Sequence, residues 1–182
     1  PYDTSPWPDK SSDPFESVSP SGSSTPVAKK TVSQELHQDD GRPKGKKSFP
    51  RGMAVQFKVP SEGKWVLTSV RIHGSRYGHP TPPREDFHVT LCDVDFEPLT
   101  DFAFPYSKFK RSGRQTWVKL KTKPTEVPDE FVICVDFNAE ATKGVYVSHD
   151  AEGTALVGKP GHRAGSFSGG DWLIRATVEK VE

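Results

Sequence analysis

The 182-residue sequence has little covalent chemistry to hold a fold together, with two cysteines, one methionine and no long apolar run. Cys92 and Cys134 are too few for a disulfide scaffold and have no metal-ligand spacing. No stretch approaches the roughly 20 apolar residues of a transmembrane helix. The net charge is only +1, which gives no general electrostatic reason to expect nucleic acid or an anionic membrane as partner. We therefore expect no transmembrane segment and no nucleic-acid partner.

Apolar residues are also scarce, at 32%, and they are concentrated after residue 47. Residues 1–47 are rich in proline and serine and have too few aliphatic side chains to offset the entropy of ordering. We interpret them as a linker or extended tail, with the basic run 41–47 as a solvated junction. Trp7 and Phe15 could anchor this tail on a partner or on the domain itself. The folded domain is predicted over residues 48–182.

From residue 48 onward the apolar residues alternate with a period of two, which predicts β-strands. No segment carries a sustained apolar stripe of helical period, so helices should be short or absent. We predict an all-β antiparallel sandwich, with a jelly roll of about eight strands as the wiring. The expected strands are 52–59, 64–74, 86–96, 100–106, 115–121, 130–137, 144–149 and 171–181.

The alternation also assigns each side chain to a face of its strand. Trp172 falls on the apolar phase and is predicted in the core, whereas Trp65, Trp117 and Tyr146 fall on the opposite phase. These three rings could form an exposed aromatic surface that stacks on sugar rings or covers a partner. Alternatively, they lie under the long loops as a satellite cluster.

The segment His73 to Phe87, "HGSRYGHPTPPREDF", joins two predicted strands and is longer than a tight turn requires. Its prolines stiffen it, so that Arg76, Tyr77, His79 and Arg84 could be held in place as polar binding residues. The alternative is that Arg76 and Tyr77 close the open end of the sandwich. In either case we expect the segment to form one rim of the sandwich and any binding site to touch it.

Both cysteines fall opposite the core phase of their strands. A bridge between them requires Cα atoms within about 7 Å, and hence neighbouring strands or side chains that meet under a loop. A single disulfide and two buried thiols both remain open.

The remaining polar groupings are weak. Asp93, Asp95 and Glu97 share one strand phase and could form a calcium site, although an exposed, charged strand face explains them equally well. The histidines match no zinc pattern, and the consecutive Ser148, His149 and Asp150 cannot form a triad because neighbouring strand residues point to opposite faces. The glycine-rich run 158–172 lacks a phosphate-loop pattern and is interpreted as a flexible surface loop. We expect no catalysis and no cofactor other than calcium.

The order of motifs, from "GMAVQFKVP" through "WVLTSVRIHGSRYG", "DFHVTLCDVDF" and "VPDEFVICVDF" to "GDWLIRATV", resembles an appended, jelly-roll-like all-β domain. Such domains occur near the C-terminus of multidomain bacterial envelope or exported proteins. The resemblance covers about residues 48–182 and implies an extracytoplasmic setting, periplasmic, envelope-associated or secreted. The general layout is also similar to carbohydrate-binding modules, although one fold hosts many functions.

Two functions from different classes follow. In the first, the sandwich is a non-catalytic binding module that recognises glycan or another envelope component. Its aromatic candidates are Trp65, Trp117 and Tyr146, and the loop candidates are Arg76, Tyr77, His79 and Arg84, whose arginines could also pair with acidic sugars or sulfate. In the second, the chain is a structural or interaction subunit of a larger assembly whose N-terminal tail docks on a protein partner.

Overall fold

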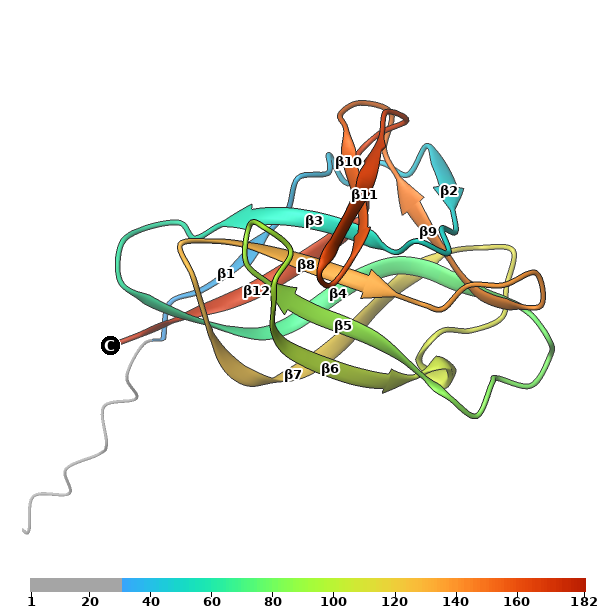
Figure 1. Ribbon diagram of the computed structural model, residues 1–182, viewed down its shortest axis with the longest axis horizontal. Coiled ribbons are helices and arrows are strands. Elements are labelled where there is room, and N and C mark those ends of the chain that lie inside the picture. The colour runs from blue at the N-terminus through green and yellow to red at the C-terminus, as the bar shows by residue number, and fades with distance from the viewer. Residues whose placement is uncertain (1–30) are drawn as a thin grey trace, which may run out of the picture. The chain divides into compact units, whose positions relative to one another are not determined.

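Two antiparallel β-sheets face each other in the computed structural model, which describes residues 31–182 (Figure 1). Trp7 and Phe15 lie outside the described residues. The strands are β1 (Ser33–Leu36), β2 (Gly45–Lys47), β3 (Met53–Lys58), β4 (Lys64–Gly78), β5 (Asp86–Cys92), β6 (Pro98–Pro105), β7 (Thr116–Val127), β8 (Glu130–Asp136), β9 (Lys143–His149), β10 (Ala155–Lys159), β11 (His162–Phe167) and β12 (Ile174–Val181), with one 3-10 turn, η1 (Tyr106–Lys108). The predicted all-β antiparallel sandwich is confirmed.

The strand order within the sheets is that of a jelly roll with additions. The strand order in sheet A is β1-β12-β4-β9-β2. Strand β7 pairs with the edge of β4 opposite to the one that β12 and β9 share. The order in sheet B is β11-β10-β3-β8-β5-β6. Without β2, β9, β10 and β11, the two sheets reduce to β1-β12-β4-β7 and β3-β8-β5-β6, which is the order produced by two Greek keys. The added strands extend both sheets at one end, where the β10–β11 hairpin stands above the sandwich in Figure 1.

The core between the sheets is built from the inward phase of each strand. Phe87 of β5 is at the centre of an aromatic group, with its ring centroid 4.9 Å from Phe137, 5.6 Å from Phe109 and 5.7 Å from Tyr106. Trp172 is fully buried, as the alternation predicted. Rings that pack edge-on or tilted at these separations add a little to their large area of burial. The core thus fixes the two sheets against each other. Because its side chains are buried, a binding site is to be sought on the outer faces and rims.

Strand β4 contains a β-bulge that changes which side chains face the core. Against β12, Leu67 and Ser69 pair with the consecutive residues Val178 and Thr177, so that Thr68 is one extra residue in β4. Before the bulge Trp65 and Leu67 point inward, and after it Val70 and Ile72 do. The prediction of an exposed Trp65 ring is therefore wrong: only 2% of its surface is exposed, because strict alternation cannot register an inserted residue.

Four strands were not expected, and β4 is longer than predicted. Strands β1 and β2 lie within the segment assigned to the tail, and the folded unit begins at Thr31 and not at residue 48. Their few apolar residues hid them, since both are short edge strands. The expected glycine-rich surface loop forms the β10–β11 hairpin, and β4 continues through Gly78, taking up the first part of the proline-rich segment.

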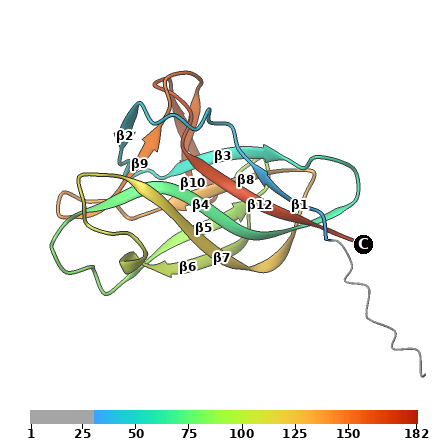
Figure 2. The same cartoon turned by 180° about the vertical axis from the view of Figure 1, so that it is seen from behind.

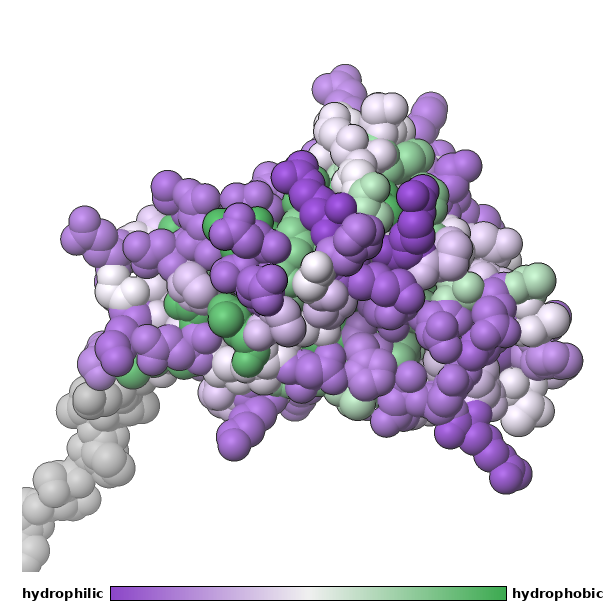
Figure 3. Space-filling model, in the orientation of Figure 1, coloured by the Kyte–Doolittle hydropathy of each residue, from purple (hydrophilic) through white to green (hydrophobic). Residues whose placement is uncertain are grey.

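The outer face of sheet B carries a second, smaller apolar cluster. Cys92 and Cys134 lie on the neighbouring strands β5 and β8 and are buried beside Phe96 and Leu156. Their sulfur atoms are 3.8 Å apart and unbridged, so both cysteines are free thiols. Around this cluster, the face seen in Figure 3 is mainly hydrophilic with scattered apolar patches.

Candidate functional site

Sheet A faces the viewer in Figure 2, and polar and aromatic side chains lie along β4 on its outer face. Arg71, His73, Ser75 and Tyr77 alternate along this strand and so share one face. Across it, Arg71 is paired with Arg175 of β12, His73 with Trp117 of β7, and Ser75 with Tyr146 of β9. The register therefore places two of the predicted aromatic residues, Trp117 and Tyr146, on the same face, on opposite sides of β4.

At one end of this face, Trp117 is held between two arginines. The guanidinium carbons of Arg71 and Arg175 lie 4.8 and 4.7 Å from the centre of the indole ring, which are cation–π contacts. Glu35 binds both arginines, at 2.8 Å from Arg71 and 3.2 Å from Arg175. Asp39, whose side chain is fully buried, binds Arg175 at 2.6 Å. We call these five residues the arginine clamp.

The pKa shifts in the arginine clamp follow its charge balance. The hydrogen bond from Arg175 to Asp39 raises the pKa of the guanidinium. Burial acts to raise the pKa of Glu35, but the hydrogen bonds from Arg71 and Arg175 outweigh it and lower that pKa. Each cation of the clamp has a carboxylate, so the ring of Trp117 is already covered by paired charges. The clamp therefore stabilises the fold, and neither of its arginines is left without a carboxylate for a ligand to pair with.

Between the two ends lies the pair His73 and Ser148. The Nδ1 atom of His73 is 2.7 Å from the Ser148 hydroxyl, and its ring packs edge-on against Trp117 with centroids 5.1 Å apart. Burial, together with Arg175, lowers the pKa of His73 despite the opposing effect of Asp39. Ser148 is only 1% exposed, so its hydroxyl is not presented to a substrate. The pair ties β4 to β9 and does not form a nucleophilic site.

At the other end, Tyr77 and Tyr146 pack together with ring centroids 4.5 Å apart. Tyr77 is paired with Gly144 of β9, and a side chain at that position would lie 2.4 Å from the Tyr77 hydroxyl oxygen. The glycine therefore makes room for the Tyr77 ring to lie across the strand. The Tyr77 hydroxyl donates to the Glu140 carbonyl oxygen at 2.8 Å, which fixes the ring.

The two tyrosines line an open cavity of about 290 Å³, which we call the tyrosine cavity. Its other lining residues come from β2, from β4 and from the segment before β7: Lys46, Arg76, Gly78, Arg111, Ser112 and Gly113. The ammonium of Lys46 lies 5.1 Å from the centre of the Tyr146 ring and donates to the Gly113 carbonyl at 3.2 Å. Arg111 donates through Nε to the Gly78 carbonyl at 2.7 Å.

Arg76 is the most buried of the cavity's cations, with 4% of its surface exposed. Its two terminal nitrogens donate to the carbonyls of His79 and Pro80, so it closes the end of the sandwich as one of our two alternatives proposed. Its Nε has no hydrogen-bond partner within residues 31–182. Burial and the neighbouring charge of Arg111 lower the pKa of Arg76.

The other loop candidates lie away from the tyrosine cavity. His79 lines a different cavity of about 370 Å³ with Pro80, Thr81, Pro83, Thr142 and Lys143. Arg84 is exposed and lines neither cavity. The structure thus brings Tyr77 and Tyr146 together on the outer face. The Arg76 side chain points to the other face of β4, where it contacts the His79 carbonyl, and Trp65, Trp117 and Arg84 do not line the tyrosine cavity.

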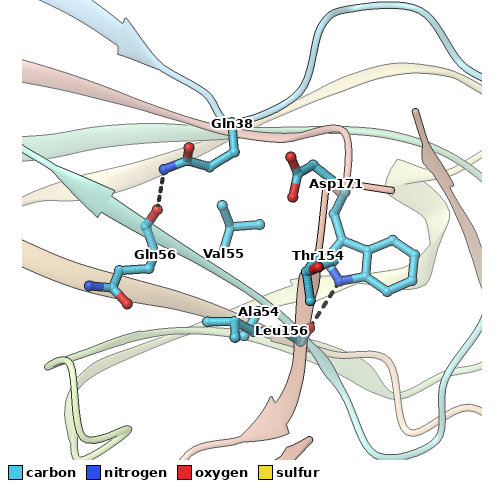
Figure 4. A pocket seen from close by; sticks show the side chains of 9 residues that line it. Gln38, Ala54, Val55, Gln56, Thr154, Leu156 and Asp171 are labelled. Atoms are coloured by element: carbon cyan, nitrogen blue, oxygen red, sulfur yellow. Dashed lines mark hydrogen bonds between the residues drawn. The ribbon is translucent and has the colours of Figure 1, made fainter. Parts of the chain in front are cut away.

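A third cavity, of about 220 Å³, opens beside β3 and β10 (Figure 4). Several of its polar groups are already engaged: the Gln38 amide donates to the Gln56 carbonyl, and the Trp172 indole donates to the Leu156 carbonyl. Burial, together with the negative charges of Asp150 and Asp39, raises the pKa of Asp171 in its wall. These internal hydrogen bonds leave it fewer free donors than the tyrosine cavity has.

The three acidic residues considered for calcium do not share a strand, because β5 ends at Cys92. They lie in the turn that follows, where the Asp93 carboxylate accepts the backbone N–H groups of Asp95 and Glu97 at 2.9 and 3.0 Å. In the part of the chain that the structure describes, no three His, Cys, Asp or Glu side chains are grouped to hold a metal ion. Nor does that part contain a helix long and apolar enough to cross a membrane.

Comparisons with protein-family models, curated proteins and solved structures give no match for this chain.

Sequence reasoning did not single out Lys46 or Arg111 as site residues. Lys46 belongs to the basic run that we took for a solvated junction, and Arg111 to the polar connection before β7. A basic run placed next to a strand edge was the available signal, but only the pairing of β2 with β9 brings Lys46 to Tyr146.

Proposed function

We propose that this chain is a non-catalytic binding module that recognises a glycan at the tyrosine cavity. The observation that carries the proposal is the pair of partly exposed rings, Tyr77 and Tyr146, next to hydrogen-bond donors that the fold leaves unused. Sugar rings combine apolar C–H faces with many hydroxyl groups. A site that binds them needs aromatic surface and polar groups side by side.

The donors are available because the fold uses only part of each side chain. Arg111 donates a hydrogen bond from Nε to the Gly78 carbonyl, and its terminal nitrogens form no hydrogen bond within residues 31–182. The hydroxyl of Tyr146 likewise has no hydrogen-bond partner among the described residues, whereas that of Tyr77 is fixed. The cavity, at about 290 Å³, is at the small end of ligand sites, which fits a contact with one or two sugar units.

The non-catalytic part of the proposal is supported by the state of the one serine–histidine pair on this face. Ser148 is buried and hydrogen-bonded to His73, so its hydroxyl is not presented to a ligand. The extracytoplasmic setting rests on the resemblance alone and stays a prediction. So does the alternative of a subunit that docks through its N-terminal tail.

Affinity electrophoresis tests the proposal. The full chain is run through native gels that contain xylan, β-glucan, galactomannan or polygalacturonate. We expect retardation by at least one polymer, and we expect Tyr146→Ala to abolish it because the ring supplies the apolar contact. Leu99→Ala is the matched control, since Leu99 is an exposed apolar residue on sheet B. Free migration in all four gels, or equal retardation of the Tyr146→Ala variant, would contradict the proposal.

A further inference from the structure

We infer that the tyrosine cavity receives an anionic group, a carboxylate or a sulfate ester, carried by the saccharide. This inference rests on the proposed function and narrows it to acidic glycans. It begins from Lys46, Arg76 and Arg111, which all line the cavity.

None of these three cations has an acidic partner in the described part of the chain. None of the ion pairs formed within residues 31–182 includes them, although other cations of the same region are paired, such as Arg71 and Arg175 with Glu35. The acidic side chains closest in sequence and fold to Tyr77 are also engaged: Glu85 and Glu140 both bind Lys143. Positive charge therefore collects in the cavity without internal compensation.

Arg76 adds an independent observation. A buried guanidinium is normally matched by a carboxylate, because removing an ion from water is costly. Here its neighbours are two backbone carbonyls and the like charge of Arg111, and its Nε is unpaired. Its side chain points to the inner face of the sheet beside Val145, so Arg76 adds positive potential behind the cavity, while Lys46 and Arg111 would contact the anion.

The mobility of these side chains is restricted by the fold. The backbone bridge between Arg76 and Arg111, and the hydrogen bond from Arg111 Nε to the Gly78 carbonyl, hold Arg111 at the cavity. A guanidinium presents parallel N–H groups that match a carboxylate or sulfate in a bidentate way. Lys46 enters from β2 and contributes a second, flexible positive group next to the Tyr146 ring.

A saccharide fits these observations better than an extended polyanion. The charged site is confined to a cavity of about 290 Å³ that also contains two aromatic rings, and the whole chain has a net charge of only +1. A nucleic acid or acidic peptide would be drawn by a broad basic surface. We therefore expect one anionic substituent to enter the cavity while its sugar ring packs on the tyrosines.

The test compares polymers that differ only in charge. Binding of the full chain is measured by calorimetry for polygalacturonate and its fully methyl-esterified form, for dextran sulfate and dextran, and for poly-L-glutamate. We expect at least one charged saccharide to bind ten-fold or more tightly than its neutral counterpart and than poly-L-glutamate. Arg111→Gln and Lys46→Gln should each weaken that binding about ten-fold. Lys123→Gln, an exposed change of the same charge on β7, should leave it unaltered, with circular dichroism confirming the fold of each variant.

The outcomes separate this inference from the proposed function. Equal binding of charged and neutral saccharides, both lost in Tyr146→Ala, would overturn the inference and leave glycan binding intact. Binding of poly-L-glutamate as tight as that of the acidic saccharides, or equal weakening by Lys123→Gln, would show a general charge effect and also overturn it. Absence of binding to every saccharide would reject both.

Discussion

The two ends of the outer face of sheet A contain the same kinds of side chain in opposite electrostatic states. The arginine clamp combines two arginines, an aromatic ring and two carboxylates that pair with them. The tyrosine cavity combines Lys46, Arg111 and two aromatic rings, and no carboxylate within residues 31–182 pairs with either cation. A cation next to an aromatic ring is therefore a poor indicator of a binding site by itself. The presence or absence of a countercharge distinguishes a structural cluster from a receptive one.

The largest expected effect comes from breaking the charge balance of the clamp. Asp39→Asn removes the buried carboxylate that holds Arg175 and leaves that guanidinium with Glu35 alone. We expect a loss of about 3 kcal/mol in the free energy of unfolding, measured with urea. Asp40→Asn is the matched control at an exposed neighbour and should cost less than about 0.5 kcal/mol. A loss of similar size in both variants would remove the special role of Asp39.

Removing one aromatic ring at each end of the face sharpens the comparison. Trp117→Ala removes the ring between Arg71 and Arg175 and should destabilise the fold by about 2 kcal/mol, since partly desolvated cation–π contacts are lost. It should leave polysaccharide binding unchanged. Tyr146→Ala should do the reverse, with binding lost and a smaller fall in the thermal unfolding midpoint. If Trp117→Ala also abolished binding, the two ends would have to be treated as one site.

Removing an unpaired cation should have a smaller effect on the free energy of unfolding, and one that does not destabilise the fold. Arg111→Gln removes a positive charge next to Arg76, so the free energy of unfolding should stay the same or rise by up to about 0.5 kcal/mol. The same substitution at Arg71 breaks an ion pair with Glu35 and should lower stability. Chemical denaturation of the two variants at low and high salt measures both effects. A clear loss of stability in Arg111→Gln would show that the hydrogen bond from Arg111 to the Gly78 carbonyl outweighs the repulsion between the two arginines.

The smallest effects concern two carboxylates whose pKa values shift in opposite directions. The pKa of Glu35 is lowered from 4.5, so its stabilising contribution is present above its unfolded-state pKa and is lost as pH falls through the folded-state value. The pKa of Asp171 is raised from 3.8, so the folded state binds the proton more tightly. The stabilising contribution of this proton is present below the unfolded-state pKa and is lost as pH rises through the folded-state pKa. Glu35→Gln and Asp171→Asn should each remove the corresponding slope from unfolding midpoints measured between about pH 3 and 7.

Local patterns determined much of the fold. Alternation located the strands that became β3 to β9 and β12, and it placed Trp172 and the inward residues of β5 and β8 correctly, because each of these strands buries one apolar face. It failed for the edge strands β1, β2 and β11, which contain too few apolar residues to show a period, and for β10, whose five residues lie in a glycine-rich stretch. It also failed at Trp65, where the bulge in β4 changes the phase.

The site was predictable only in part. Arg76, Tyr77 and Tyr146 were identified from residue type and from the composition of the segment around them. Their meeting with Lys46 and Arg111 depends on strand pairings between residues far apart in the sequence. Charge pairing is likewise invisible from sequence, since Glu35 and Asp39 of the supposed tail turned out to neutralise Arg175.

Strand β4 passes through both ends of this face. From Trp65 to Ile72 it has a neighbouring strand on each side, whereas from Arg76 to Gly78 it has β9 on one side and only the bridge from Arg76 to Arg111 on the other. Its amide protons should therefore exchange with solvent slowly around Val70 and faster around Tyr77. The strand is therefore firmly held from Trp65 to Ile72 and more loosely held from Arg76 to Gly78. Ligand binding should slow amide exchange in the second segment alone.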